Sequence, residues 1–351
     1  MASNRQKRRN RNYWQKRFLV VKQEQEKSNT PYAKEIRKLF DESNRKLESE
    51  LRKWYDRYAE NDLITEEEAQ ELLSKAEQQT WSMTLQEFRR KAIEGGHDQE
   101  LNREYYTSRV SRVQQLQTQM KMHLFELAAV EHGLLEAHLT NRFTNSYLHN
   151  VYEVQNMTGQ LRAGVAASFT QYSQRQVEMI IKKPWHGSNF SKRVWGNDVH
   201  RLPDELQTIM TTAVQNGQGV DEIVKAIQGR FDIAKNRAVT LAQSEAGHIA
   251  EEASMLAYEE TGVKKYQYLS TLEIHTCEVC GDLDGDIIDV KKREVGVNYP
   301  LMHPNCRYTT IPYFEDDFGI QGQRFARDPV TGKRYLTAAM SFNEWKESIA
   351  A

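Results

Sequence analysis

VQQLQTQMKMHLFELAAVEHGLLEA, residues 113–137, is the stretch that decides the fold class. Side chains suited to a core recur every seven residues, with a second set three residues later: Val113, Met120, Leu127 and Leu134, then Leu116, His123, Val130 and Ala137. This spacing is the a/d stripe of a helix in a bundle or coiled coil. It predicts a long helix with one buried face. Because such stripes are ordinarily cores, we interpret His123 as a core histidine and not as a ligand.

The residues before and after this stretch extend the helical interval. The chain has no proline between Pro31 and Pro184, and glycine is sparse there. Thr30-Pro31 fits an N-cap followed by the first helical turn. Thr65-x-x-Glu68 and Thr84-x-x-Glu87 are capping boxes, each followed by apolar residues at helical spacing. We therefore predict an elongated helical domain.

The sequence pattern changes after residue 182, where glycine and proline residues become frequent and separate shorter predicted elements. The pattern predicts helices over residues 203–215, 220–228 and 233–260, strands over 263–272 and 309–313, and a short helix after Ser341. This combination of short helices and strands predicts a small α+β domain.

Two pairs of metal-binding residue types lie between the predicted strands. Cys277-x-x-Cys280 places two thiols on one tight turn, and His303-x-x-Cys306 follows after 22 intervening residues. This spacing is typical of a tetrahedral Cys₃His zinc site, and it uses every cysteine of the chain. Four protein ligands leave no open position for an activated water, so the sequence predicts one structural zinc ion that stabilises the C-terminal domain.

The composition restricts the class of protein. Hydrophobic residues make up 39% and charged residues 28% of the 351 residues, a balance that favours elongated helical architecture over one compact globule. No apolar run approaches the roughly 18 residues of a membrane span, so we expect no membrane partner. Three cysteines confined to one stretch do not make a disulfide framework.

The N-terminal segment is strongly basic although the net charge of the chain is −1. Residues 1–22 hold no acidic residue and eight basic ones: Arg5, Lys7, Arg8, Arg9, Arg11, Lys16, Arg17 and Lys22. Tyr13, Trp14 and Phe18 lie among them and could stack on bases. A solvated, disordered charge run is the plain alternative. We expect this basic arm to bind double-stranded DNA without sequence specificity.

Three clusters in the C-terminal half resemble one protein family. They are Trp185–Trp195, Ala238–Glu245, and the metal segment Leu272–Gly285 closed by Pro300–Arg307. Over roughly residues 185–313 the chain is similar to the minor head proteins of tailed bacteriophages, the family of the phage Mu F protein.

This resemblance implies a function and a location. Such a protein is a virion component inside the phage head, made in the cytoplasm of the bacterial host. It acts in head morphogenesis and in the packaging or ejection of DNA, and it is not an enzyme. The implied partners are the portal protein and packaged DNA, with the scaffold or major capsid protein as further candidates. The portal is also an alternative target for the basic arm.

Two other functions stay open. An HNH-like nuclease also combines a zinc knuckle with a histidine-bearing loop, but it needs a free histidine base, whereas His303 is assigned to the metal and His275 has no partner at a suitable spacing. A zinc protein that binds nucleic acid through the metal loop would need basic residues there, and that loop is acidic at Glu278, Asp282, Asp284, Asp286 and Asp289.

The predicted organisation therefore has four parts. They are a disordered basic arm (residues 1–30), a helical domain (31–182), the Mu F-like domain with the zinc site (183–315), and a tail with a short helix (316–351).

Overall fold

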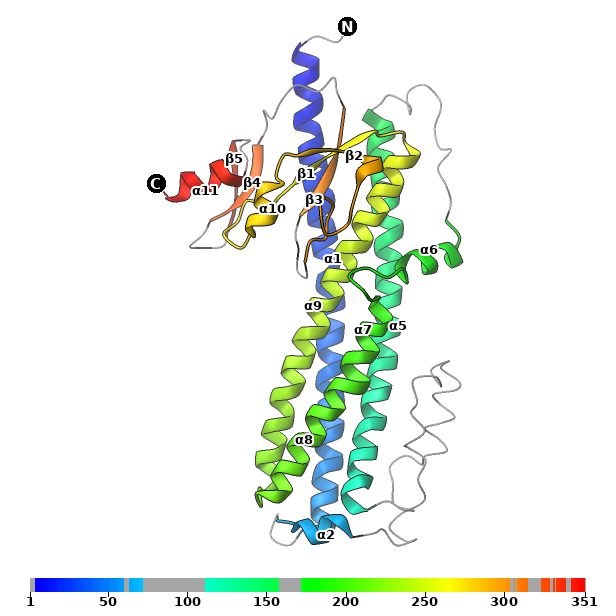
Figure 1. Cartoon of the computed structure of the whole chain (residues 1–351), viewed down its shortest axis with the longest axis vertical. Helices are drawn as coiled ribbons and strands as arrows, with labels where there is room; N and C mark the ends of the chain where they lie inside the picture. Colours follow the sequence, from blue (N-terminus) through cyan, green and yellow to red (C-terminus); the bar gives the residue numbers. More distant parts are fainter. Residues whose placement is uncertain are drawn as a thin grey trace. The chain divides into compact units, whose positions relative to one another are not determined.

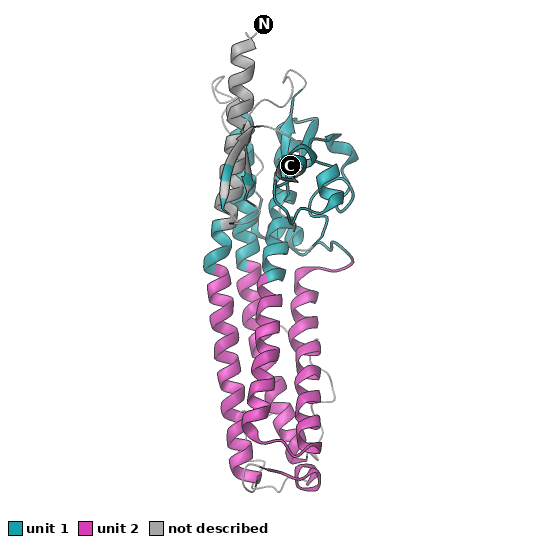
Figure 2. Cartoon of the chain, turned by 90° about the vertical axis from the view of Figure 1, so that its left-hand side faces the viewer, with its two compact units in different colours: residues 1–31, 137–186, 240–351 teal, residues 32–136, 187–239 magenta. Residues whose placement is uncertain are grey.

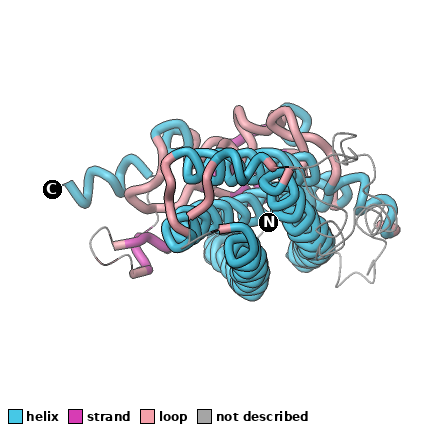
Figure 3. Tube along the Cα trace, turned by 90° about the horizontal axis from the view of Figure 1, so that it is seen from below, coloured by secondary structure: helices cyan, strands magenta, loops and turns pink. Residues whose placement is uncertain are grey.

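The computed structural model describes residues 4–59, 63–71, 111–157, 172–303, 306, 308–314, 323–328, 331, 333–338 and 342–350, with the backbone alone for residues 4–26 (Figure 1). Helices make up most of this part of the chain (Figure 3). The prediction of a mainly α fold is therefore confirmed. The helices are α1 (Asn4–Tyr58), α2 (Glu66–Gln70), α5 (Arg112–Met157), α6 (Gln174–Ile181), α7 (Phe190–Trp195), the π-helix η3 (Gly196–Arg201), α8 (Leu202–Gln215), α9 (Val220–Glu260), α10 (Glu278–Asp282), the 3₁₀ turn η4 (Val290–Lys292) and α11 (Phe342–Ala350).

The chain divides into two compact units (Figure 2). Unit 1 comprises residues 1–31, 137–186 and 240–351, and unit 2 comprises residues 32–136 and 187–239. Helices α1, α5 and α9 each contribute a segment to both units. Each unit thus draws on segments far apart in the sequence, and the domain borders at residues 30, 182 and 315 stay a prediction.

Unit 2 is built from helices alone in its described part. The ring of Phe40 on α1 meets that of Phe231 on α9 at 6.5 Å, and the ring of Phe125 on α5 meets that of Trp195 on α7 at 5.2 Å. Trp54 Nε1 donates to the carbonyl oxygen of Arg112 at 2.9 Å, where α5 begins. These aromatic residues fill the space between the helices of the bundle.

The first part of the predicted stripe on α5 is correct, and its continuation is wrong. Val113, Leu116, Met120 and Leu127 are buried. Val130 is 48% exposed, and the buried positions move to Glu131, Leu135 and Leu139. A straight α-helix drifts by about 20° per heptad relative to a strict seven-residue repeat, so a neighbouring straight helix selects a 3.6-residue period instead.

Two helix limits also differ from the prediction. Helix α1 begins at Asn4, so Pro31 lies inside it and not in its first turn. Helix α9 runs without a break from Val220 to Glu260 and joins the two helices expected at 220–228 and 233–260, because Gly229 does not end it. The capping box at Thr65 is confirmed on α2. The one expected at Thr84 lies outside the described residues.

Unit 1 contains a three-stranded antiparallel sheet of order β2-β1-β3, formed by β1 (Lys265–Leu269), β2 (Ile287–Asp289) and β3 (Thr309–Tyr313). Pro312 is tolerated in β3 because this strand lies at the edge of the sheet. Tyr258 of α9, Tyr266 of β1 and Ile311 of β3 share one buried core. The strand predicted over 309–313 is confirmed, and the strand predicted over 263–272 is present but shorter, from Lys265 to Leu269.

A hairpin completes the described part of unit 1. Strand β4 (Gln323–Arg327) pairs antiparallel with β5 (Arg334–Ala338), and the short helix expected after Ser341 is α11. Trp345 of α11 packs with Leu272 and Ala326. In the described residues, no helix combines the length and the apolar character that a membrane crossing requires.

Candidate metal centre and its polar frame

The first pair of predicted ligands lies at the start of α10. Cys277 is the N-cap residue of this helix, and Cys280 lies one turn further on. The amide of Gly281 donates to the carbonyl oxygen of Cys277 at 2.9 Å. This short turn brings the two thiols to the same side, as expected for a Cys-x-x-Cys knuckle.

The loop before β3 brings a third ligand to these thiols. His303 Nε2 lies 3.5 Å from Cys277 Sγ and 3.9 Å from Cys280 Sγ. Bonds of about 2.3 Å to sulfur and about 2.0 Å to nitrogen at tetrahedral angles would place such donor atoms about 3.5 Å apart. Among the described residues, Cys277, Cys280 and His303 are the group whose ligand atoms all lie within 4.8 Å of one another.

Cys306 is the fourth predicted ligand, and it lies beside this group. Its amide donates to the carbonyl oxygen of His303 at 3.1 Å, and its buried thiol makes a hydrogen bond with the Cys280 thiol. The structure therefore brings Cys306 into contact with one member of the cluster. The donor set of three sulfurs and one nitrogen fits tetrahedral zinc.

Burial and neighbouring hydrogen-bond donors shift the pKa values of the three thiols in different directions. Burial raises the pKa of Cys306, but hydrogen bonds from the Cys280 thiol and from backbone N–H groups outweigh it and lower that pKa to about 6. The same hydrogen bond raises the pKa of Cys280, and burial adds to the rise. Burial also raises the pKa of Cys277, yet hydrogen bonds from Cys280 and His303 lower it overall. The pKa shifts of Cys277 and Cys306 are thus both in the direction of the thiolate, which is the form that binds metals.

A buried shell surrounds the cluster. Leu301, Tyr268 and Tyr308 pack against the cysteines in one core. The Ser270 hydroxyl donates to the carbonyl oxygen of Cys280, and the Ser270 amide donates to Asp284 Oδ1 at 2.8 Å. Side chains that fix the backbone around ligands in this way orient a metal site.

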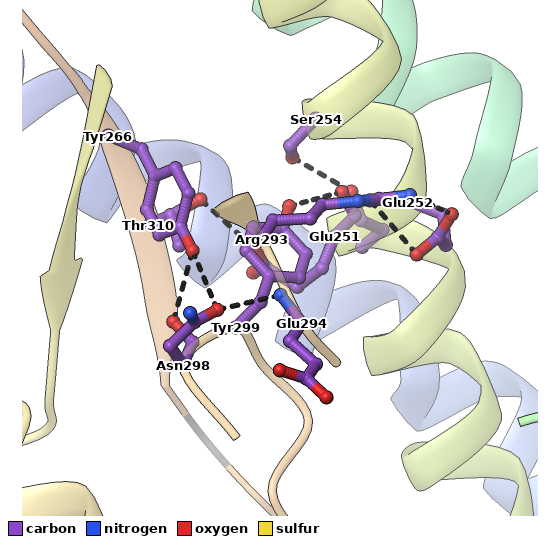
Figure 4. Close-up of polar contacts among 10 residues, drawn as sticks. Glu251, Glu252, Ser254, Tyr266, Arg293, Glu294, Asn298, Tyr299 and Thr310 are labelled. Carbon is purple, nitrogen blue, oxygen red and sulfur yellow. Dashed lines mark hydrogen bonds and ion pairs between the residues drawn. The ribbon is translucent and has the colours of Figure 1, made fainter. Parts of the chain in front are cut away.

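A frame of polar contacts connects α9 to the loop between β2 and β3 (Figure 4). Arg293 donates from both terminal nitrogens to the two carboxylate oxygens of Glu252, at 3.1 and 3.2 Å. Its guanidinium also lies over the ring of Tyr299, 5.3 Å from the centroid. The Tyr299 hydroxyl donates to the carbonyl oxygen of Glu251 at 2.6 Å, and the Thr310 hydroxyl donates to the Glu251 carboxylate at 3.3 Å.

Asn298 fixes the turn within this loop. Its Oδ1 accepts from the amide of Glu294 at 2.7 Å and from the Tyr266 hydroxyl at 3.2 Å, and its Nδ2 donates to the carbonyl oxygen of Lys292. The chain between β2 and His303 is therefore held by side chains of both the helix and the sheet. This explains why the loop reaches the cysteines from a distance in sequence.

A second buried contact, within unit 1, joins Trp185 to α9. Trp185 Nε1 donates to Glu245 Oε2 at 2.8 Å, and the Trp185 ring stacks on His248 at 4.5 Å. The hydroxyl of Ser244 donates back to the carbonyl oxygen of Thr240 at 2.9 Å. The side chains of Ser244, Glu245 and His248 thus take part in packing.

Sequence reasoning missed the frame residues Glu251, Glu252 and Arg293. A signal for the glutamates was available, since these carboxylates interrupt an otherwise apolar face of α9 that carries Ala246, Ile249, Ala250 and Ala253. Buried carboxylates need partners.

The basic arm is described by its backbone alone, which is helical from Asn4. The side chains of its predicted nucleic-acid-binding residues lie outside the described part of the chain: Arg5, Lys7, Arg8, Arg9, Arg11, Lys16 and Arg17.

The region that contains the metal cluster and its frame matches a known family. Residues 204–311 match the sequence profile of the family described as phage Mu protein F like protein. Over this segment the chain is similar to that family. It runs from α8 through β3 and includes the four predicted metal ligands, so the predicted resemblance is confirmed there.

Two curated proteins are similar to the chain over part of their length. An NAD(+)–arginine ADP-ribosyltransferase EFV of Enterococcus faecalis is 26% identical over 165 residues, which cover 42% of this chain and 33% of that protein. An uncharacterised protein of Haemophilus influenzae is 22% identical over 114 residues, which cover 32% of this chain and 26% of that protein. The chain therefore spans a third or less of these relatives, and the activity in the first name is that protein's own. No solved structure matches the chain.

Proposed function

We propose that this chain is a non-enzymatic minor head protein of a tailed bacteriophage, carried inside the head near the portal. The observation that carries this proposal is the Mu F-like region at residues 204–311. The family match supports a role in phage head morphogenesis and a place in the virion. The proposal adds the location near the portal and a part in the packaging or ejection of DNA.

Within this proposal, Cys277, Cys280, His303 and Cys306 hold one structural zinc ion. Their residue types, the donor distances of 3.5 and 3.9 Å, and the contact between Cys280 and Cys306 support it. A bound zinc would connect α10 to the loop before β3, and its binding free energy, on the order of 10 kcal/mol or more, would stabilise this part of unit 1.

The geometry favours this structural role over the nuclease alternative. His303 Nε2 lies 3.5 Å and 3.9 Å from the thiols of Cys277 and Cys280, a position in which it would serve as a ligand to the proposed zinc. A nuclease of the HNH type needs a histidine that is free to accept a proton from the attacking water. His275 is exposed, and its neighbours in the sequence are Ile274 and Thr276.

The partners follow from the proposed location. The portal protein is the primary partner, the scaffold or major capsid protein is a further one, and the basic arm contacts packaged double-stranded DNA. The arm's charge supports contacts with phosphates, which carry no base specificity.

Purified heads test this function most simply. We expect the chain in full heads at a fixed number of copies per portal ring, and a complex of the chain with its co-expressed portal on gel filtration. A portal that does not bind the chain at any salt concentration, while heads still contain it, would reassign the contact to the scaffold or capsid protein. Heads that form, package and eject DNA normally without the chain would refute the proposal.

A further inference from the structure

Two carboxyl groups meet inside the helical core of unit 2. Glu131 on α5 is 1% exposed, and Asp198 on the π-helix η3 is 3% exposed. The two side chains are hydrogen-bonded to each other. A hydrogen bond between two carboxyl groups requires a proton, so at least one of them is protonated in this arrangement.

The surroundings explain which group holds the proton. Burial, together with the charge of Asp198 and the hydrogen bond to it, raises the pKa of Glu131 well above its ordinary value. Burial raises the pKa of Asp198 as well, but the hydrogen bond from Glu131 and the charge of Arg237 on α9 oppose that rise. Of the two groups, Glu131 therefore holds the shared proton more tightly, and the charge of Arg237 favours the ionised form of Asp198.

Other polar groups face the pair from each neighbouring helix. Tyr32 on α1 is buried, and its pKa is raised by burial and by the charges of Glu131, Glu35 and Asp198. On α5 itself, the adjacent His132 contacts Ser191 Oγ at 3.0 Å and Glu136 at 3.9 Å. In the described residues, Arg237 is the cation whose charge acts on Asp198. If Glu131 were ionised together with Asp198, Arg237 would therefore have to balance two negative charges.

The backbone at Asp198 is unusual. Residues 196–201 form a π-helical turn between α7 and α8, and Trp195, Asp198, Val199 and Leu202 are buried along it. Such widened turns are rare and occur frequently at functional sites. Glu131 Oε2 and Asp198 Oδ2, the oxygens outside the shared hydrogen bond, have no hydrogen-bond partner among the described residues. The hydrogen bond between the two carboxyl groups is therefore a polar link between this turn and α5.

We propose that Glu131 and Asp198 form a proton-controlled clasp, which holds the π-helical turn against α5 while the pair keeps its shared proton and releases the turn when that proton is lost. Two ionised carboxylates in contact inside a low-dielectric core repel each other, and each loses hydration without compensation.

The direction of the pH effect follows from linkage. The folded state holds the proton more tightly than the unfolded chain, so the contribution of the clasp is complete below the ordinary pKa of glutamate. It falls as the pH rises toward the raised pKa of folded Glu131. Between these limits, the opening equilibrium of the clasp should increase by up to about tenfold per pH unit, the dependence for one proton.

Hydrogen exchange of the full-length chain tests this proposal. Protection factors for residues 127–135 and 194–203, corrected for the intrinsic exchange rate, should fall between pH 5 and pH 9. In Glu131→Gln the amide can donate to Asp198 at every pH, so protection there should be independent of pH and about tenfold or more above the natural chain at pH 9. Glu126→Gln removes a half-buried carboxylate from the same helix and should keep the natural pH dependence.

A second measurement does not depend on the variant folding. The infrared carbonyl band of a protonated carboxyl group should persist in the natural chain at pH 7 and disappear at alkaline pH. Protection that is flat with pH in the natural chain would overturn the proposal. So would an equal slope in the natural chain and in Glu131→Gln, or the absence of the carboxyl band at pH 7.

Discussion

The contact between Arg293 and Glu252 gives the sharpest prediction for the polar frame (Figure 4). In Arg293→Met the side chain keeps an unbranched apolar stem, but Glu252 loses both hydrogen bonds, at 3.1 and 3.2 Å, and Tyr299 loses the overlying cation. The side chain of Glu252 is only 9% exposed, so its carboxylate stays in a poorly solvated site.

The magnitude follows from that burial. Removing one partner of a fully buried ion pair costs about 3–5 kcal/mol. Because the Arg293 side chain is 22% exposed, water reaches this pair in part, and we expect a cost of about 2–3 kcal/mol. The double variant with Glu252→Gln should recover at least about 1 kcal/mol, because it removes the unpaired charge.

Hydrogen exchange over residues 287–313 in the full-length chain measures this cost locally, since a chain with two compact units need not unfold in one step. Lys292→Met is the matched control. Its ammonium lies at 3.7 Å from Asp289 on the surface, and its loss should change stability by about 0.5 kcal/mol or less. Equal effects of Arg293→Met and Lys292→Met would refute the argument that this frame fixes the loop.

Two further predictions concern the packing of Trp185 and the basic arm. Trp185→Phe keeps an aromatic ring but removes the donor to the buried Glu245 carboxylate; we expect a loss of about 1–3 kcal/mol, seen as a lower melting temperature, and an unchanged melting temperature would contradict the assigned contact. The full-length chain should bind duplex DNA of any sequence, with a log–log salt slope of about −0.9 for each phosphate contact, and a chain that begins at Thr30 should bind far less. Undiminished binding by that shorter chain would show that the arm is not the contact.

The local features of the sequence predicted the structure well. The knuckle at Cys277 and Cys280, the strand at 309–313 and the capping box at Thr65 each depend on residues within a few positions of one another. Short-range stereochemistry favours such features before any distant contact forms.

Features that depend on distant partners could not be predicted in this way. The seven-residue repeat on α5 failed at Val130 because the choice between a supercoiled and a straight helix depends on the neighbouring helices. Rules for proline and glycine predicted helix limits at Pro31 and Gly229, and both were wrong. At Gly229, the burial of Phe231 and Ala234 in the following turn outweighs the cost of a glycine inside a helix, about 1 kcal/mol.

The polar contacts were the hardest part to predict. Arg293 and Glu252 are 41 positions apart, and no spacing rule connects them. Their pairing follows only from the way the loop after β2 returns to α9. The same holds for Glu131 and Asp198, which meet because the π-helical turn is packed against α5.

Metal content tests the central claim most directly. Full-length protein purified without chelator should contain one zinc ion per chain by elemental analysis, and both Cys277→Ser and His303→Ala should lose it and reduce hydrogen-exchange protection over residues 263–313. A chain that contains no zinc, and whose protection over this segment is the same before and after treatment with chelator, would contradict the account.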